Sequence, residues 1–170
     1  GGHSSMPLPN NSIYRLSKAL NLFSQYTFPI RLTPGLRTYL KAASQIEKPE
    51  VARAMIEVAD SKKTIPKQAL SFLESDPSRV ATLRTTCVAT MIKGGIRENA
   101  LPTEASATLN CRLMPGETVD ELKATIIGLI NNKEIEVKPQ DMVNFSGPSK
   151  TDGVFSAALQ KVTQRLWPKA

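Results

Sequence analysis

The clearest hydrophobic pattern of the chain is a strict alternation over residues 105–113, with apolar side chains and cysteine on one face and polar side chains on the other. A period of two is typical of a β-strand that buries one face. Residues 80–92 are rich in Val, Thr, Ile and Leu, which predicts a preceding extended segment. Gly94 and Gly95 end this segment, and turn-forming residues at 99–102 predict a connecting loop. The sequence therefore predicts a pair of neighbouring strands.

Apolar residues at helical spacing predict three amphipathic helices around this strand pair. Asn10 or Asn11 can cap the first helix, Thr118 opens the second with capping-box spacing, and Asp152 can cap the third. The apolar stripes of the three helices consist of Ile13, Leu16, Leu20, Phe23, Val119, Leu122, Ile126, Leu129, Phe155, Leu159, Val162 and Leu166. A helix with such a stripe packs one face on a core.

Residues 33–77 read as a helical insertion between the first helix and the strand pair. Pro34, Pro49 and Pro66 can each begin a short helix, because proline is favoured in the first helical turn. The apolar side chains of the insertion could belong to a core or could line an entrance for an apolar acyl group. The core interpretation is favoured, because apolar stripes usually form core. After the second helix, residues 134–137 alternate briefly and predict a last strand.

The net charge of +7 makes nucleic-acid binding a question, but the sequence argues against it. Only Lys62 and Lys63 are adjacent basic residues, and the predicted strands lack the aromatic side chains on which bases stack. Nucleic acid is therefore not an expected partner. A membrane is not expected either, because no apolar run is long enough to cross a bilayer. No secretory signal is visible, so a soluble protein, with the cytoplasm slightly favoured, is expected.

The two cysteines, Cys87 and Cys111, lie on successive predicted strands. A disulfide between the strands is conceivable, but two buried free thiols are the favoured interpretation, since free cysteine is commonly buried. With a single histidine, the chain has no cluster of His and Cys ligands for a metal.

Three stretches carry a resemblance to a known family. Residues 94–102 read Gly-Gly-Ile-Arg-Glu-Asn-Ala-Leu-Pro, residues 110–118 read Asn-Cys-Arg-Leu-Met-Pro-Gly-Glu-Thr, and the chain opens with Gly-Gly-His-Ser-Ser-Met-Pro. They resemble the lid or dimerisation domain of the di-zinc metallopeptidases, a family that includes aminoacylase, carboxypeptidase S, glutamate carboxypeptidase and succinyl-diaminopimelate desuccinylase. A helical insertion at this place resembles the carboxypeptidase S branch of the family, whose members accept apolar N-acyl amino acids.

The resemblance implies an α+β fold, a ferredoxin-like two-layer sandwich whose four-stranded antiparallel sheet carries two main helices on one face. Residues 1–32 and 78–138 would form this lid/dimerisation domain, and residues 33–77 its helical insertion. Residues 139–170 would form a loop and helix that return toward a catalytic domain. The first strand of the fold would precede Gly1, so we expect the chain to be a piece of a longer protein.

The resemblance also implies the reaction of the parent protein, which is hydrolysis of an amide bond beside a free carboxylate in a peptide or an N-acyl amino acid. Two zinc ions perform this reaction in the family, and their ligands belong to the catalytic domain. No metal ligand is therefore expected in this chain, which alone should be inactive. The expected partners are a second copy in a homodimer, the chain's own catalytic domain and the substrate. The alternative is a homodimerisation module without a direct catalytic contribution.

Three residues match functional positions of the family. His3 would reach the zinc site of the partner subunit and donate a hydrogen bond to the developing oxyanion. Arg112 would bind the substrate carboxylate with its guanidinium fork. Asn99 would contact the substrate or orient groups near its carbonyl. The plainer alternatives are a solvated terminal histidine, a surface salt bridge and a turn-forming asparagine.

Overall fold

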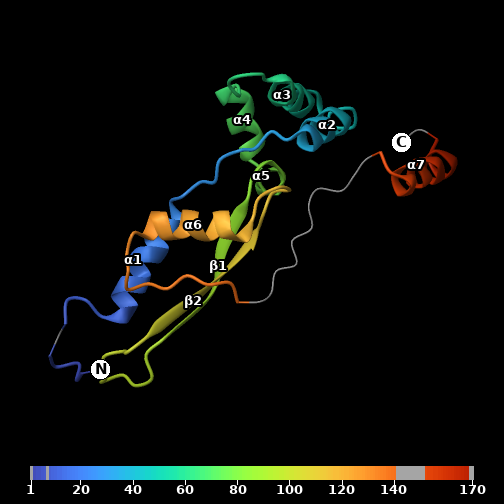
Figure 1. Cartoon of the computed structure of the whole chain (residues 1–170). Helices are drawn as coiled ribbons and strands as arrows, with labels where there is room; N and C mark the ends of the chain where they lie inside the picture. Colours follow the sequence, from blue (N-terminus) through green and yellow to red (C-terminus); the bar gives the residue numbers. More distant parts are fainter. Residues whose placement is uncertain (1, 7, 141–151, 169–170) are drawn as a thin grey trace.

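The computed structural model describes residues 2–6, 8–140 and 152–168 of the chain. These residues form seven α-helices and one sheet of two antiparallel strands (Figure 1). The α+β class is therefore confirmed, whereas the ferredoxin-like sandwich stays a prediction. Among the described residues, none of the helices combines the length and the apolar character needed to cross a membrane.

The two strands form a hairpin, as the alternating pattern predicts. Strand β1 (Thr86–Gly94) pairs with strand β2 (Ala105–Arg112) in an antiparallel ladder. The ladder ends where Gly94 lies opposite Ala105, and a Cβ atom at Gly94 would lie 3.1 Å from Cγ1 of Ile13. Glycine therefore allows the first helix to approach the end of the hairpin closely.

Helices α1 (Ser12–Ser24) and α6 (Val119–Ile130) pack against each other, and α1 also contacts both strands. The side chain of Asn11 caps α1 by accepting a hydrogen bond from a backbone N–H of the first turn. Helix α6 begins with a capping box, in which the side chains of Thr118 and Glu121 each accept a hydrogen bond from the other residue's backbone N–H. Both helices and their caps are confirmed.

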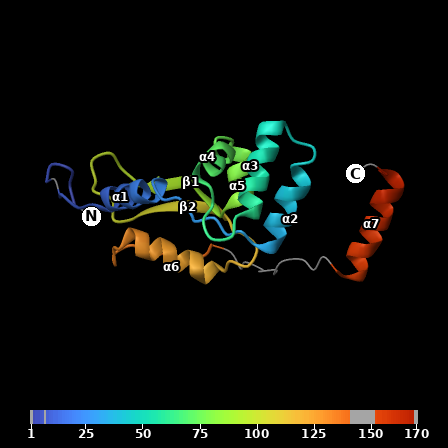
Figure 2. The ribbon, with the colours of Figure 1, turned by 90° about the horizontal axis from the view of Figure 1, so that it is seen from above.

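Four short helices separate α1 from the hairpin: α2 (Pro34–Ala43), α3 (Pro49–Asp60), α4 (Lys67–Glu74) and α5 (Pro77–Leu83). Helix α3 packs between α2 and α4, and α4 contacts α5. Figures 1 and 2 show these helices gathered at one end of the hairpin, away from the loop that joins β1 to β2.

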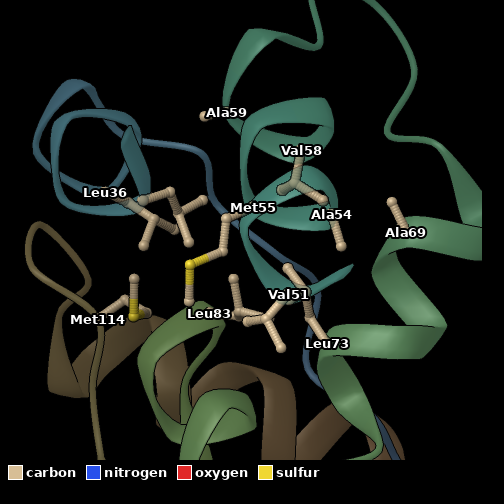
Figure 3. Packing of buried hydrophobic residues seen from close by; sticks show 11 residues of the cluster. Leu36, Val51, Ala54, Met55, Val58, Ala59, Ala69, Leu73, Leu83 and Met114 are labelled. Carbon is tan, nitrogen blue, oxygen red and sulfur yellow. The ribbon is translucent and has the colours of Figure 1, made fainter. Parts of the chain in front are cut away.

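The main hydrophobic core of the described residues lies within this helical insertion (Figure 3). Val58 is 0% exposed, and Leu73 and Leu83 are each 1% exposed. The cluster comprises Leu36, Leu40, Val51, Ala54, Met55, Val58, Ala59, Ala69, Leu73, Leu83 and Met114. The apolar stripes of the insertion therefore pack on one another, which supports the core interpretation over the acyl entrance.

Three local predictions are wrong. The sequence predicts an extended chain from residue 80, but α5 continues to Leu83, because the Asp76 side chain caps it by accepting the backbone N–H of Ser78. Residues 134–137 form no strand, because no strand among the described residues lies beside them to complete a ladder. Helix α7 (Val154–Leu166) is present, but its N-cap is Gly153 rather than Asp152. Most of the loop predicted at 139–151 lies outside the described residues.

Cys87 and Cys111 form a disulfide bond, so the expectation of two buried free thiols is wrong. The two residues are directly opposite in the ladder, with their Cα atoms 4.1 Å apart, and both are half-buried. The Cβ atoms of directly opposite residues on antiparallel strands lie close together. The alternation of side chains along one strand does not show which residue of the other strand lies opposite.

Candidate functional site

His3 lies against the loop that joins the two strands, where an isolated antiparallel bridge holds it. Backbone hydrogen bonds flank it on both sides: the N–H of Leu101 donates to the carbonyl of Gly2 at 2.7 Å, and the N–H of Ser4 donates to the carbonyl of Asn99 at 3.0 Å. The imidazole itself is exposed. The hairpin therefore fixes the backbone of His3 and leaves its side chain accessible.

The contacts of the His3 ring assign its proton in the neutral state. Nδ1 accepts a hydrogen bond from the backbone N–H of Ser5 at 3.2 Å and lies 2.8 Å from the Ser5 hydroxyl oxygen. Because a backbone N–H can only donate, Nδ1 carries the lone pair and Nε2 carries the proton. Within the described part of the chain, Nε2 has no hydrogen-bond partner. An exposed Nε2–H is a donor that can serve an oxygen atom outside this chain.

Asn99 lies in the same loop, and the structure brings it close to His3 through the hydrogen bond between its carbonyl and the N–H of Ser4. Its side chain is exposed and makes no hydrogen bond to another described residue. His3 and Asn99 therefore form one pair of candidate residues at the loop end of the hairpin.

Arg112 is the last residue of β2 and pairs with Thr86, the first residue of β1. Its side chain is exposed on the polar face of the strand, as the alternation predicts. No hydrogen bond or ion pair joins its guanidinium to another described residue. The carboxylate of Glu117, five residues further along the chain, is paired with Arg31 at 3.2 Å. Arg112 therefore offers a free fork of donors at the end of the hairpin where the insertion lies.

The structure does not bring Arg112 together with His3 and Asn99. The loop-end pair and Arg112 are separated by the length of β2, whose eight residues extend roughly 23 Å from Ala105 to Arg112 at about 3.3 Å per residue. Figure 1 shows the start of the chain at one end of the hairpin and the insertion at the other. One small substrate cannot contact both ends of a single hairpin.

Two residues that the sequence does not single out hold the region around Arg112. Thr85 is 1% exposed, and its hydroxyl donates to the carboxylate of Glu117. The sequence signal for Glu117 is its place in the Pro-Gly-Glu turn of the 110–118 motif, where Gly116 has a φ of 91° that glycine adopts readily.

The described residues do not fit a di-zinc centre. Among them, no group of three or more His, Cys, Asp or Glu side chains could hold a metal ion. His3 already uses Nδ1 within the chain, and both cysteines form the disulfide. One hollow lies beside α1 and the end of α6, and another lies between α3 and α4. Neither is lined by His3, Asn99 or Arg112.

Comparison with known proteins assigns the family. The model of the peptidase dimerisation domain matches residues 1–138. The chain therefore belongs to the peptidase dimerisation domain family, as the three sequence motifs indicate. No solved structure matches the chain significantly.

Several curated proteins are similar over most of the chain. The N-fatty-acyl-amino acid synthase/hydrolase PM20D1 of Xenopus tropicalis is 30% identical over 90% of this chain and 34% of its own length. Its human counterpart is 28% identical over 99% of this chain and 33% of its own length. The probable carboxypeptidase S-like 1 of Dictyostelium discoideum is 27% identical over 91% of this chain and 31% of its own length. The chain thus spans about a third of the length of the curated relatives it matches.

Proposed function

We propose that this chain is the lid of a zinc-dependent hydrolase that cleaves an amide bond beside a free carboxylate, in a peptide or an N-acyl amino acid. The placement of His3 and Arg112 at opposite ends of one hairpin carries this proposal. Each offers an exposed hydrogen-bond donor with no partner for it among the described residues. The names of the relatives, an N-fatty-acyl-amino acid synthase/hydrolase and a probable carboxypeptidase, agree with this substrate class.

His3 supplies a hydrogen bond to the oxygen of the scissile carbonyl as negative charge develops there. The hydrogen bond that Nδ1 accepts from the backbone N–H of Ser5 orients the ring and its Nε2–H. A donor that is already oriented stabilises a developing oxyanion without reorganisation. Asn99, beside it on the same loop, contacts the substrate near this carbonyl.

Arg112 supplies the anchor for the substrate's free carboxylate. A guanidinium presents parallel N–H donors that match the two carboxylate oxygens, and such charge-assisted bonds are stronger than neutral ones. Anchoring the carboxylate positions the adjacent amide bond for attack.

Two copies of the chain are needed for His3 and Arg112 to contact the same substrate. A single hairpin keeps His3 and Arg112 at opposite ends of β2, whose eight residues extend roughly 23 Å at about 3.3 Å per residue. In a homodimer, the Arg112 end of one copy and the His3 end of its partner lie at the same catalytic site. A two-fold interface provides two such sites.

The zinc ions and the residues that bind them belong to a catalytic domain outside this chain. When bound there, the metal ions supply polarisation of the carbonyl and an activated water. Helix α7 packs against that domain. The apolar stripe of α7 supports this, because Phe155 is 82% exposed and Leu159 is 57% exposed among the described residues. This chain alone has no hydrolase activity.

The alternative function is homodimerisation without a direct catalytic contribution. The exposed apolar side chains of β1 favour it: Val88, Met91 and Ile92 are between 54% and 63% exposed. Exposed apolar side chains on a strand with an unpaired edge are a template for pairing with another chain.

Substitution of His3 in the full-length enzyme separates the two functions. The His3→Ala variant should lose about a hundredfold in kcat, the usual cost of removing one oxyanion donor, while the dimer persists in light scattering. The His3→Gln variant is the matched control, since its amide N–H can replace Nε2–H, and it should retain part of the activity. Unchanged kcat in the dimeric His3→Ala variant would leave dimerisation as the function.

A further inference from the structure

The chain that follows Arg112 makes a tight turn. The backbone N–H of Glu117 donates to the carbonyl of Met114 at 3.0 Å, and Gly116 between them has a φ of 91°. With proline at the second position and glycine at the third, these are the features of a type II β-turn. The turn sets the direction in which the Glu117 side chain leaves the backbone.

One buried hydroxyl fastens both ends of this turn. Thr85 accepts a hydrogen bond from the N–H of Met114 at 2.8 Å and donates its own proton to the carboxylate of Glu117. Its donor and its acceptor capacity are both used, although the residue is only 1% exposed. Thr85 directly precedes Thr86, which pairs with Arg112 in the ladder. The hydrogen bonds of Thr85 therefore hold the backbone on both sides of the position where Arg112 projects.

The same carboxylate also holds the helical insertion. Glu117 Oε1 lies 3.2 Å from Nε of Arg31, two residues before the insertion, and the side chain of Glu117 is only 13% exposed. Ile30 and Arg84 form an isolated bridge that brings the two ends of the insertion together. Arg84 in turn pairs with Glu74 of α4. Glu117 thus contacts the chain before the insertion through Arg31 and the chain after it through Thr85.

Packing joins the turn to the insertion as well. Met114 is 8% exposed and belongs to the hydrophobic core of the insertion (Figure 3). By contrast, the Arg112 side chain makes no hydrogen bond or ion pair with any other described residue. The position of its guanidinium therefore depends on the backbone beside it, and that backbone is held by Thr85 and Glu117.

We infer that Thr85 and Glu117 are positioning residues for Arg112: their hydrogen bond fixes the turn that follows β2 and so holds the guanidinium where the substrate carboxylate binds. This inference rests on the proposed role of Arg112. It makes the helical insertion the support of the carboxylate anchor, since the hydrogen-bonded turn and the insertion core share Met114. The effect of these residues is confined to substrates that carry the carboxylate.

The test compares two substrates of the full-length enzyme, N-dodecanoylalanine and N-dodecanoylalaninamide, which lacks the free carboxylate. Thr85→Val removes the hydroxyl, and Glu117→Gln removes the charge. Each should raise the KM for the acid about fivefold to tenfold, within the range of coupling energies between contacting residues, and leave the KM for the amide within about twofold. Thr85→Ser, which keeps the hydroxyl, should behave like the parent enzyme.

Two controls separate this inference from its foundation. Glu134→Gln removes a carboxylate from an exposed pair with Arg15, remote from the turn, and should leave both KM values unchanged. Arg112→Ala should raise the KM for the acid alone, and the rise should not grow when Thr85→Val is added. If Arg112→Ala left the KM for the acid unchanged, the proposed function and this inference would both fail. If Arg112→Ala raised it and Thr85→Val did not, or if Thr85→Val raised both KM values equally, the inference alone would be overturned.

Discussion

His3 lies against the loop at one end of the β-hairpin, and Arg112 projects from the other end, so that the length of β2 separates them. In the proposed function, the two residues act on different parts of a substrate and on different kinetic constants. His3 would act on charge that develops only in the transition state, which affects kcat. Arg112 would act on a carboxylate that is charged throughout the reaction, which affects KM.

Replacement of Arg112 in the full-length enzyme should weaken the binding of carboxylate substrates. Arg112→Ala should raise the KM by about tenfold to a hundredfold, because a charge-assisted hydrogen-bond pair is lost, and should change kcat little. Arg112→Lys should recover only part of the affinity, since an ammonium group cannot make the two parallel bonds. Steady-state kinetics measure both constants. An unchanged KM in Arg112→Ala would show that Arg112 is a surface residue that does not bind the substrate.

The disulfide between Cys87 and Cys111 should stabilise the hairpin. It closes a loop with a sequence separation of 24, for which the loss of unfolded-state entropy corresponds to about 3 kcal/mol. Replacing both cysteines by serine should lower the free energy of unfolding in urea by this order. A reducing agent should move the parent chain toward the double variant and leave the double variant unchanged. Insensitivity of the parent chain to reduction would show that the bond does not form in solution.

The capping box of α6 should make stability depend on pH in acid. The hydrogen bond from the backbone N–H of Thr118 lowers the pKa of Glu121 below its ordinary value of 4.5, with a smaller contribution from the charge of Arg31. Because the folded pKa is lowered, the ionised carboxylate stabilises the chain fully above the ordinary value, and this stabilisation is lost as the pH falls through the folded value.

The stability difference between the parent chain and the Glu121→Gln variant should therefore shrink in urea titrations as the pH falls from neutrality through and below the ordinary pKa of 4.5. Glu57→Gln, at an exposed position of α3, is the matched control. A difference that stays constant over this range would contradict the assignment of the effect to ionised Glu121. Thr118→Ala should remove the other half of the capping box at a cost of about 1 kcal/mol.

The core of the insertion should dominate the stability of the described residues. Leu73 is 1% exposed, and Leu73→Ala should lower the free energy of unfolding by about 2–5 kcal/mol through lost burial and a residual cavity. Ile46 is 90% exposed, and Ile46→Ala should change it by less than about 0.5 kcal/mol. Equal effects of the two substitutions, measured by urea unfolding, would show that the insertion does not pack as described.

Local signals in the sequence were sufficient for most of the elements. The period of two predicts β2, and capping residues predict α1 and α6, because each of these signals depends on residues that are close together in the sequence. The strand predictions at residues 80–83 and 134–137 are wrong because a short apolar run suits either a helix or a strand, and a strand also needs a neighbour. The disulfide depends on the register between strands, which no single segment encodes.

The candidate residues could be named from motifs, but their arrangement could not. His3, Asn99 and Arg112 were found by matching short stretches, and nothing in those stretches gives the length of hairpin between them. The contact between Thr85 and Glu117 could not be predicted, although Glu117 lies in the 110–118 motif, because it joins segments 32 residues apart, and threonine and glutamate are ordinary surface residues when read alone.

The most direct test of the proposed function is subunit mixing with the full-length enzyme. At a substrate concentration well below the KM of the parent enzyme, His3→Ala and Arg112→Ala homodimers should each be weakly active. A heterodimer of the two should contain one intact site, built from Arg112 of one subunit and His3 of the other. Activity after mixing should therefore rise well above that of either variant, toward half of the parent activity per heterodimer. If mixing restored nothing while mass measurements showed heterodimers, His3 and Arg112 would not act on one substrate from different subunits, and the account would be wrong.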